Sequence, residues 1–423
     1  MCLRKLAAGD RAAEVAYGHL LANPKVTLER LIEGWGEQTR TAVAGRHVLA
    51  IQDTSEIHFS TRPKHRRGLG VVGKGNARGI LAHVMVAVDA DNGACLGLAA
   101  GSIYNRKNLV RVSHAKRALE DKESKRWLET PQAAKPVLAA ADRVTVLGDR
   151  ENDIFAYWAM PSQPNFHLLA RMMRDRGVPG GGTVWNTTAH WRFVATRRVK
   201  LSATPGRAAR TATLGLRFGE VEIVRPKGKD TRRLPKTVKL RLVEVVESDP
   251  PAGVEPVHWR LLTTHAVDDV AMAWQIVDWY RLRWIIEQLF RLMKSDGLKL
   301  EDSQLESAEA LMKLTAIAAK GACVILQLVQ ARDGGAEPAA NVFSQTEIAV
   351  LDQLNKKYEG KTKLQNNPHA RHSLTWASWI IARLGGWNGY PSSRPPGPIT
   401  MRNGWEFFRV FASGWQFRDM CIL

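Results

Sequence analysis

The sequence predicts an α/β fold, because short apolar runs typical of strands alternate with segments of helical periodicity. Strands are expected, in chain order, at residues 47–52, 80–88, 95–102, 144–147 and 166–171. An acidic turn at residues 89–93 predicts that the second and third strands form a hairpin. With helices at about 115–128 and from about Asn152, the order is three strands, helix, strand, helix and strand. This pattern alone is compatible with several α/β folds.

The segments around this core differ from it in composition. Residues 9–36 have helical apolar spacing, whereas residues 174–258 are basic, with alternating runs that predict an all-β insertion. Asp268 can cap a long helix that runs to about Lys294, and another long helix is expected at about 307–331. The predicted division is a helical N-terminal part at 1–45, a core from 46–173 and 259–305, the insertion at 174–258, and a helical C-terminal region at 306–423.

The charge of the chain indicates its class of partner. Its 423 residues include 61 Lys and Arg against 41 Asp and Glu, a formal net charge of +20, which favours nucleic acids or anionic membranes. The longest apolar run, residues 311–331, is interrupted by Lys313 and Lys320, so we expect no membrane anchor. The cysteines form no CxxC pair and indicate no zinc site or disulfide framework; they are Cys2, Cys95, Cys323 and Cys421. We therefore predict a cytoplasmic protein that binds nucleic acid.

A cationic segment near the end of the core contains a single carboxylate. It has the sequence YRLRWIIEQLFRLMK over residues 280–294. At about 100° per residue, one narrow stripe of the helix holds Tyr280, Arg283, Glu287 and Lys294. The stripe points outward or into a cleft, because the opposite side is apolar and consists of Leu282, Ile286, Leu289 and Met293. On this helix alone, Arg283 and Glu287 are most simply a surface ion pair worth about 0.2–0.5 kcal/mol.

Two aspartates favour a second interpretation, because each lies just past a predicted strand. Asp53 follows an apolar run at 48–52 and Asp149 follows another at 144–148, and ligands of open α/β sheets gather at strand ends. Either aspartate alone would more simply be a cap or a turn residue. Together with Glu287 they supply the hard oxygen ligands that hold Mg²⁺ ions in two-metal phosphodiester cleavage. Arginines and lysines beside them would then bind the neighbouring phosphates.

These residues carry a resemblance to a known family. The carrying motifs are IQDTSEIHF at 51–59, LGDRENDIFAYW at 147–158, and the spacing Y-(2)-R-(3)-E-(6)-K that Tyr280, Arg283, Glu287 and Lys294 meet. From about Gly9 onward, the chain resembles the DDE transposases of cut-and-paste bacterial insertion sequences of family four. The resemblance implies a ribonuclease-H-like core, as in retroviral integrases. It also implies that Asp53, Asp149 and Glu287 are the catalytic metal ligands for two Mg²⁺ ions per site, with Mn²⁺ as a possible substitute.

The same resemblance implies residues that bind DNA. Tyr280, Arg283 and Lys294 would contact the backbone at the transposon end, and Arg171 would contact a phosphate, although a plain surface arginine is equally compatible. Trp259 and Trp284 match positions that hold a flipped base, but either could be a core residue. The implied pathway is nicking, hairpin formation, hairpin opening and strand transfer into double-stranded target DNA. The family acts as a homodimer in a paired-end complex, and residues 306–423 would contribute to dimerisation.

Other functions stay open at this point. Only 52 residues precede Asp53, so the end-recognition region expected of the family is abbreviated, and a truncated, non-catalytic DNA-binding inhibitor is the main alternative. A stand-alone ribonuclease-H-like nuclease would need neither the insertion nor the Trp-rich C-terminal segment. A glycosidase with paired acids would have no use for the positive charge. A GxGxxG match at 68–73 follows no strand and opens no helix, so residues 61–79 are interpreted as a basic loop near DNA.

Overall fold

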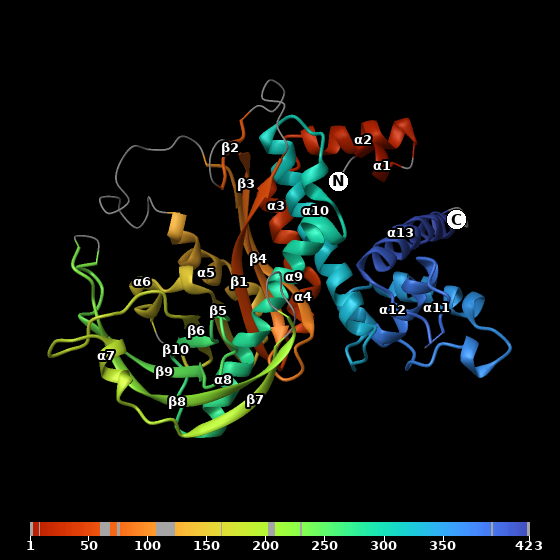
Figure 1. Ribbon diagram of the computed structural model, residues 1–423. Coiled ribbons are helices and arrows are strands. Elements are labelled where there is room, and N and C mark those ends of the chain that lie inside the picture. The colour runs from red at the N-terminus through yellow and green to blue at the C-terminus, as the bar shows by residue number, and fades with distance from the viewer. Residues whose placement is uncertain are drawn as a thin grey trace.

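The computed structural model describes residues 3–7, 9–59, 68–73, 77–106, 123–161, 163–201, 208–228, 231–390 and 392–420. Within these residues, ten strands form one sheet in the order β2-β3-β1-β5-β6-β10-β9-β8-β7, with β4 also paired to β3 (Figure 1). The strands are β1 (His47–His58), β2 (Gly70–Val71), β3 (Arg78–Asp89), β4 (Cys95–Tyr104), β5 (Arg143–Gly148), β6 (Phe166–Arg171), β7 (Ala195–Leu201), β8 (Arg210–Val224), β9 (Thr237–Glu247) and β10 (His258–Thr263). The predicted α/β class is confirmed.

The described helices surround this sheet and continue into a C-terminal group. They are α1 (Leu3–Leu6), α2 (Arg11–Ala22), α3 (Leu28–Glu33), α4 (Glu37–Ala42), α5 (Arg126–Leu138), α6 (Phe155–Trp158), α7 (Val184–Ala189), α8 (Val270–Leu282), α9 (Trp284–Arg291), α10 (Ala308–Ala331), α11 (Gln345–Tyr358), α12 (Leu374–Leu384) and α13 (Pro398–Met420). Figure 1 shows α11–α13 on one side of the β1–β4 layer and β7–β9 on the other. The C-terminal region is therefore helical, as predicted.

The centre of the sheet is parallel and buried on both faces. β1 pairs with β5 in parallel, and β5 pairs with β6 in parallel, whereas the other pairs are antiparallel. Alternate residues of β1 enter different hydrophobic clusters: Leu49 and Ile51 pack on the side of α8–α10, and Val48 and Ala50 pack on the side of α5 and α6. This alternation follows from the two-residue period of a strand, and it determines the direction of every polar side chain near the strand ends.

Several predicted element boundaries are wrong. β1 extends to His58, because β3 pairs with it over its whole length while β5 pairs with it only as far as Ile51. Asp53 therefore lies within β1 rather than after it. The helical region at 9–36 is interrupted near Pro24, as its sequence indicates: α2 ends at Ala22, and α3 begins where Thr27 accepts a hydrogen bond from Arg30 N. The helix expected from Asn152 is a 3-10 turn followed only by the short α6.

Two further predictions fall partly on residues outside the described part of the chain. The helix expected at 115–128 is described only from residue 123, where α5 begins at Arg126 and continues to Leu138. The segment 61–79 was expected to be a loop, but its described part contains β2, which pairs with β3 at Gly79. A two-residue strand paired with β3 therefore lies within the expected loop.

The long helix expected from Asp268 to Lys294 is divided into three segments. Asp269, rather than Asp268, caps α8, because its carboxylate accepts from Met272 N at 2.7 Å, while Asp268 pairs with Arg241. α8 ends at Leu282, α9 begins at Trp284, and residues Leu292–Asp296 form a π-helical turn. Apolar periodicity continues across such breaks, so the sequence pattern cannot reveal them. π-helical turns are frequent at functional sites.

The insertion continues the sheet of the core. β9 pairs with β10 along six residue pairs from His258 to Thr263, and β8 and β7 follow outward from β9. The segment also contains α7, which Thr183 caps by accepting a hydrogen bond from Asn186 N. The expectation of an all-β insertion is therefore wrong in this respect, although strands dominate it.

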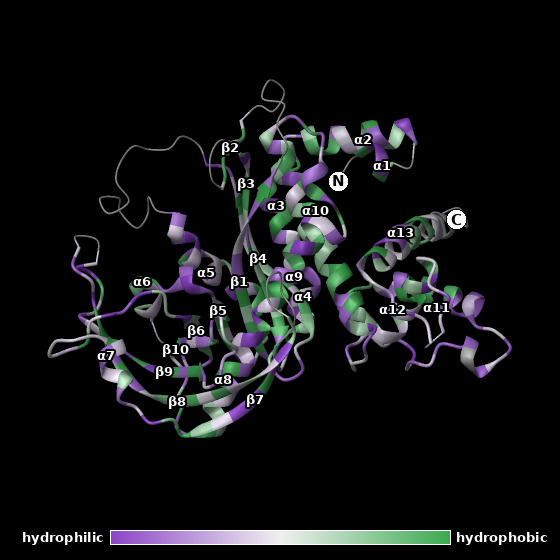
Figure 2. Cartoon of the chain, viewed as in Figure 1, coloured by the Kyte–Doolittle hydropathy of each residue, from purple (hydrophilic) through white to green (hydrophobic). Residues whose placement is uncertain are grey.

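α10 is a buried core helix. It lies within the range expected for the second long helix, Ser307 caps it by accepting a hydrogen bond from Ala310 N, and Trp35 Nε1 donates to Ala316 O at 3.0 Å. Within the described residues, α10 alone is long and apolar enough to cross a membrane, but most of its surface is covered by the protein. Figure 2 shows hydrophobic residues along α10 and the strands next to it.

The Sγ atoms of Cys95 and Cys323 lie 3.8 Å apart between β4 and α10, as free thiols, while Cys2 and Cys421 lie outside the described residues.

The contact between α12 and α13 depends on two glycines, and it gives a first testable prediction. A Cβ atom at Gly404 would lie 1.8 Å from Ile381 O, and one at Gly385 would lie 2.0 Å from Thr400 O. We expect Gly404→Ala to reduce the free energy of unfolding by about 1–3 kcal/mol or more, because the two helices must move apart. Gly414→Ala on the same helix is the control, since a Cβ there meets nothing within 4 Å. Urea denaturation that found equal stability for both variants would contradict this packing.

Three histidines meet on the face of the sheet near α8. His47 Nε2 and His265 Nε2 lie 2.8 and 2.7 Å from the hydroxyl of Thr145, and the rings of His167 and His265 stack with centroids 3.9 Å apart. Burial, the nearby Arg143 guanidinium and the neighbouring histidines lower the pKa of His47 to about 4 and that of His265 to about 2. Both rings are therefore neutral in the folded protein at neutral pH.

These depressed pKa values predict a pH-dependent stability. Below pH about 6.5 the unfolded chain binds protons that the folded histidines reject, so the free energy of unfolding should fall as the pH falls through the range between about 6.5 and 4. We expect His265→Gln, which can keep a hydrogen bond to Thr145, to reduce this loss by about 1–2 kcal/mol at pH 5. Urea denaturation of both proteins at pH 5 and pH 8 measures the difference. Equal pH dependence in both would show that His265 titrates normally.

Candidate active site

The register of the parallel strands brings two aspartates to one place. Ile51 of β1 lies opposite Leu147 of β5, and Asp53 and Asp149 each follow two residues later. Ile51 and Leu147 belong to the hydrophobic cluster on the side of α8–α10. Because side chains alternate along a strand, Asp53 also points to this side, and the chain leaving β5 carries Asp149 to the same edge.

Local hydrogen bonds orient both aspartates. Asp53 Oδ1 accepts from Thr54 N at 2.7 Å, and its side chain is only 14% exposed. Asp149 caps the 3-10 turn after β5, where its Oδ1 accepts from Glu151 N at 2.7 Å. Each carboxylate thus has one oxygen engaged by the backbone, and the second oxygen of Asp53 faces α9.

Arg283 joins Asp53 to Glu287. Its Nη1 donates to Asp53 Oδ2 at 2.9 Å, and its Nη2 lies 3.3 Å from Glu287 Oε1. Glu287, on α9, is 39% exposed. The surface i,i+4 pair considered from the sequence does exist, but its arginine also reaches a half-buried aspartate on the sheet. The break between α8 and α9 lies at Arg283.

The charges of Asp149 and Glu287 both act on the carboxyl group of Asp53. Burial and the charge of Asp149 raise the pKa of Asp53 to about 7, with a further contribution from Glu287, although Arg283 and the Thr54 N–H act in the opposite direction. Burial alone would lower the pKa of Arg283, but Tyr280 and the carboxylates of Asp53, Glu287 and Asp149 raise it. The carboxylates repel one another, and the guanidinium compensates for this only in part.

The residue types at this site suit a hard divalent cation, but the positions of their side chains in this structure do not form a metal site. The donor set consists of carboxylate oxygens without thiol or imidazole, which are the ligands that Mg²⁺ and Mn²⁺ prefer. The raised pKa of Asp53 results first from burial and then from the charge of Asp149, which Arg283 does not fully offset. In the described part of the chain, no three His, Cys, Asp or Glu side chains are close enough to hold an ion together. Arg283 lies where positive charge is needed, between Asp53 and Glu287.

The other residues expected at the site differ in exposure. Tyr280 is largely buried, and its ring meets that of Trp259 edge-on with centroids 5.4 Å apart, so the tyrosine of the stripe does not point into solvent. Trp284 is 57% exposed at the start of α9. Arg171 Nη2 donates to His258 O at 2.6 Å, and the Arg171 guanidinium lies close enough to Tyr280 and Arg283 to interact with their charges.

Lys294 lies in the π-helical turn after α9. Burial lowers its pKa, and the nearby carboxylates of Glu301, Glu56 and Glu287 oppose this effect. Glu301 also accepts a hydrogen bond from His58 N at 3.0 Å. The ammonium group therefore lies on the same side of the fold as Glu287, but among carboxylates rather than at a purely cationic surface.

The sequence did not reveal a group of residues that supports Asp53 from the opposite side. Arg126 Nε donates to Thr54 Oγ1 at 2.9 Å, and Thr54 Oγ1 lies 2.8 Å from Nδ1 of the fully buried His83. His83 Nε2 lies 3.2 Å from Gln52 Oε1. Arg126 also pairs with Glu151 at 3.3 Å, so it links β1 to the turn that carries Asp149. Only the proximity of Thr54 and Glu151 to the two aspartates was visible in the sequence.

Comparison with known proteins gives two findings. Residues 173–319 match the family model of the transposase DDE domain, a segment that includes Tyr280, Arg283, Glu287 and Lys294 but neither aspartate. Among solved structures, the chain is similar to a piggyBac transposase in a synaptic complex with hairpin DNA, at 9% sequence identity and a TM-score of 0.39. That similarity covers 90% of this chain and 56% of the other. The match to the transposase DDE domain supports a DDE transposase.

Proposed function

We propose that this protein is a DDE transposase that performs cut-and-paste transposition of a bacterial insertion sequence of family four. Two observations support it: the β1–β5 register puts Asp53 and Asp149 near one edge of the sheet, and Arg283 pairs with both Asp53 and Glu287. Three carboxylates in a chain of net charge +20 suit phosphodiester chemistry better than chemistry on a neutral substrate. The proposed core is ribonuclease-H-like and consists of residues 46–173 and 259–305.

Asp53, Asp149 and Glu287 would hold two Mg²⁺ ions, for which Mn²⁺ could substitute. When bound, such ions generate the nucleophile and stabilise the leaving oxygen. Arg283 compensates for the charge of Asp53 and Glu287 in the metal-free protein. In the complex with DNA it would be free to bind a phosphate instead, because an arginine side chain can exchange one oxygen anion for another.

The proposed DNA surface surrounds this site. Arg171, Arg283 and Lys294 would contact backbone phosphates, and Tyr280 would contribute its hydroxyl. The exposed ring of Trp284 is available to stack on a flipped base, whereas Trp259 already contacts Tyr280. Double-stranded transposon ends and target DNA would be the partners, and hydrolysis would be followed by hairpin formation, hairpin opening and strand transfer.

A homodimer in a paired-end complex is part of this proposal. α13 exposes a series of large apolar side chains, which are Ile399, Phe407, Val410 and Phe411. Phe407, Val410 and Phe411 share one helix face by their i, i+3 and i+4 spacing, and a contiguous apolar face of this kind suits a subunit contact. The C-terminal region at 306–423 is therefore the proposed dimerisation region, and the cytoplasm is the proposed location.

The test is cleavage of a linear DNA fragment that carries the ends of the element, with Mg²⁺ and with chelator. We expect a nick at each end followed by a hairpin product, resolved on denaturing gels. The same fragment in a gel-shift assay distinguishes the truncated inhibitor, which would neither cleave nor bind the ends specifically. Absence of metal-dependent cleavage with specific end binding intact would rule out the catalytic proposal.

A further inference from the structure

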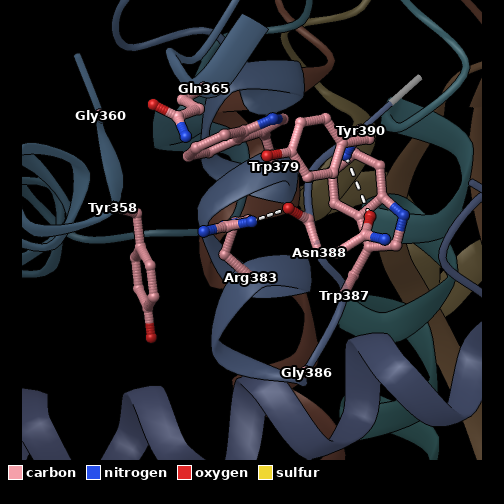
Figure 3. A pocket seen from close by; sticks show the side chains of 10 residues that line it. Tyr358, Gly360, Gln365, Trp379, Arg383, Gly386, Trp387, Asn388 and Tyr390 are labelled. Atoms are coloured by element: carbon pink, nitrogen blue, oxygen red, sulfur yellow. Dashed lines mark hydrogen bonds between the residues drawn. The ribbon is translucent and has the colours of Figure 1, made fainter. Parts of the chain in front are cut away.

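The C-terminal region contains a pocket far along the chain from the carboxylates. It has a volume of about 450 Å³ and lies between the end of α11, the end of α12 and the loop that follows α12 (Figure 3). Its aromatic walls are Tyr358, Trp379, Trp387 and Tyr390, which surround Arg383. We call it the Arg383 pocket. Among the described residues that line it, none is acidic.

Arg383 carries a positive charge without a described carboxylate partner. Its Nη1 donates to Asn388 O, and its Nε is buried without a hydrogen-bond partner in the described part of the chain. Its guanidinium carbon lies 5.4 Å from the centroid of the Tyr358 ring and 5.5 Å from that of Trp379. By contrast, Arg176 and Arg217 are largely buried arginines whose charges are compensated by the carboxylates of Asp153 and Glu244. An anion bound in the Arg383 pocket would therefore compensate for the charge of the Arg383 guanidinium.

Two glycines in the loop after α12 have positive φ values and line this pocket. Gly386 and Gly389 have φ values of +91° and +85°, in the region that favours glycine. A Cβ atom at Gly389 would lie 2.7 Å from Arg383 Nη1, so a side chain there would be strained by its φ and would displace the guanidinium. At Gly386 a Cβ would meet nothing within 4 Å. Tyr390 follows at the rim, where it is 40% exposed.

Aromatic walls, one guanidinium and side-chain amides suit a planar ligand with a negative charge. Gln365 and Asn388 provide the amides. Nucleobases stack on aromatic rings and on arginine, and phosphates bind guanidinium groups. A proline-rich peptide also binds aromatic grooves, but it would leave the charge of Arg383 uncompensated. The net charge of +20 favours the anionic ligand.

We propose that the Arg383 pocket binds one unpaired nucleotide of a DNA strand, with the base against the aromatic rings and a phosphate on Arg383. The proposal rests on the proposed function only in taking DNA as the partner. It requires neither the metal ligands nor cleavage. It would give the C-terminal region a direct role in holding single-stranded or distorted DNA.

The test uses oligothymidylate that contains 5-bromodeoxyuridine, without divalent metal and at physiological salt. Irradiation should cross-link the oligonucleotide to the full-length protein at Trp387 or Tyr390, as mapped by mass spectrometry. Fluorescence anisotropy of labelled oligothymidylate measures affinity in parallel. Loss of one base stack should weaken binding by about 5- to 150-fold in Tyr390→Leu, and Arg383→Gln should weaken it and abolish the cross-link. Lys357→Gln removes one exposed charge next to Tyr358 and is the matched control, expected to retain the cross-link.

Three outcomes would overturn the proposal. Cross-links confined to other parts of the chain, for example near Trp284, would place single-stranded DNA elsewhere. Thymidine monophosphate that competes as strongly as the oligonucleotide would make a free nucleotide the ligand. If a proline-rich peptide binds the wild-type protein but not Tyr390→Leu, and DNA forms no cross-link, the ligand would be a peptide. Because no cleavage is measured, these results are independent of the carboxylate assignment.

Discussion

Asp53→Asn is expected to abolish metal-dependent DNA cleavage and, in the same protein, to stabilise the metal-free fold. Cleavage should fall by on the order of 10⁴-fold or more, as for removal of a single catalytic residue, because the neutral amide is a poor ligand for Mg²⁺. Stability should rise because burial and the neighbouring carboxylates raise the pKa of Asp53 to about 7, so its charged form is disfavoured in the fold. We expect a gain of roughly 1–2 kcal/mol at pH 8, below the full value of the shift since the site is partly exposed.

The sign of this effect also defines its pH range. A carboxyl group whose folded pKa is raised stabilises the fold only while it is protonated, so wild-type protein loses this contribution as the pH rises between about 4 and 7. The variant lacks the titrating group, and the difference between the two proteins should therefore grow over this range. Urea denaturation in chelator at several pH values measures it, and denaturing gels measure cleavage. Glu306→Gln on the exposed segment before α10 is the control for a simple change of charge.

A loss of stability in Asp53→Asn at pH 8 would show that the ion pair with Arg283 outweighs the repulsion from Asp149 and Glu287. Unchanged cleavage would remove Asp53 from the proposed metal ligands. The two measurements are independent, because one is made without metal and the other requires it. If Asp53 is kept charged for catalysis at the expense of stability, Asp53→Asn should both lose cleavage and gain stability.

The parts of this site that the sequence could predict are those determined by strand geometry. Runs of apolar residues located β1 and β5, and the tendency of ligands to gather at strand ends singled out Asp53 and Asp149. The extension of β1 past Asp53 was not predictable from the chain itself, because it depends on pairing with β3 rather than on local composition. The error did not affect the direction of Asp53, because alternation along the strand is the same in both cases.

The features that the sequence could not predict depend on hydrogen bonds between remote segments. The break at Arg283 does not interrupt the apolar periodicity of the helix. Asp268 and Asp269 are also equally suitable N-cap residues by residue type. The hydrogen bonds from Arg126 through Thr54 to His83 join residues of α5, β1 and β3, and no local sequence pattern predicts them. Likewise, the alternating runs of the insertion predicted strands but not their partners, and β9 joins the core sheet by pairing with β10.

Glu244 connects the insertion to the proposed DNA surface. It lies on β9, directly opposite Arg217 of β8 and Arg260 of β10 in the strand register. The buried carboxylate accepts from Arg217 Nε at 2.6 Å, lies 2.8 Å from Arg260 Nε, and lies 2.7 Å from His258 Nε2. His258 and Arg260 flank Trp259 on β10, so the same carboxylate holds both neighbours of the tryptophan that packs against Tyr280.

Glu244→Gln is expected to destabilise the protein by about 3–5 kcal/mol, because it leaves two partly buried guanidinium groups without their counter-charge. Burial alone would raise the pKa of Glu244, but His258, Arg217 and Arg260 lower it to about 2. The stabilising effect of Glu244 is therefore fully present above pH about 4.5 and is lost as the pH falls towards 2. The matched control is Glu220→Gln, which breaks a cross-strand pair with Arg241 on the same two strands, β8 and β9. Since Glu220 is 55% exposed, that change should cost less than about 1 kcal/mol. Urea denaturation at pH 7 distinguishes the two, and equal losses would mean that Glu244 acts as an ordinary surface ion pair.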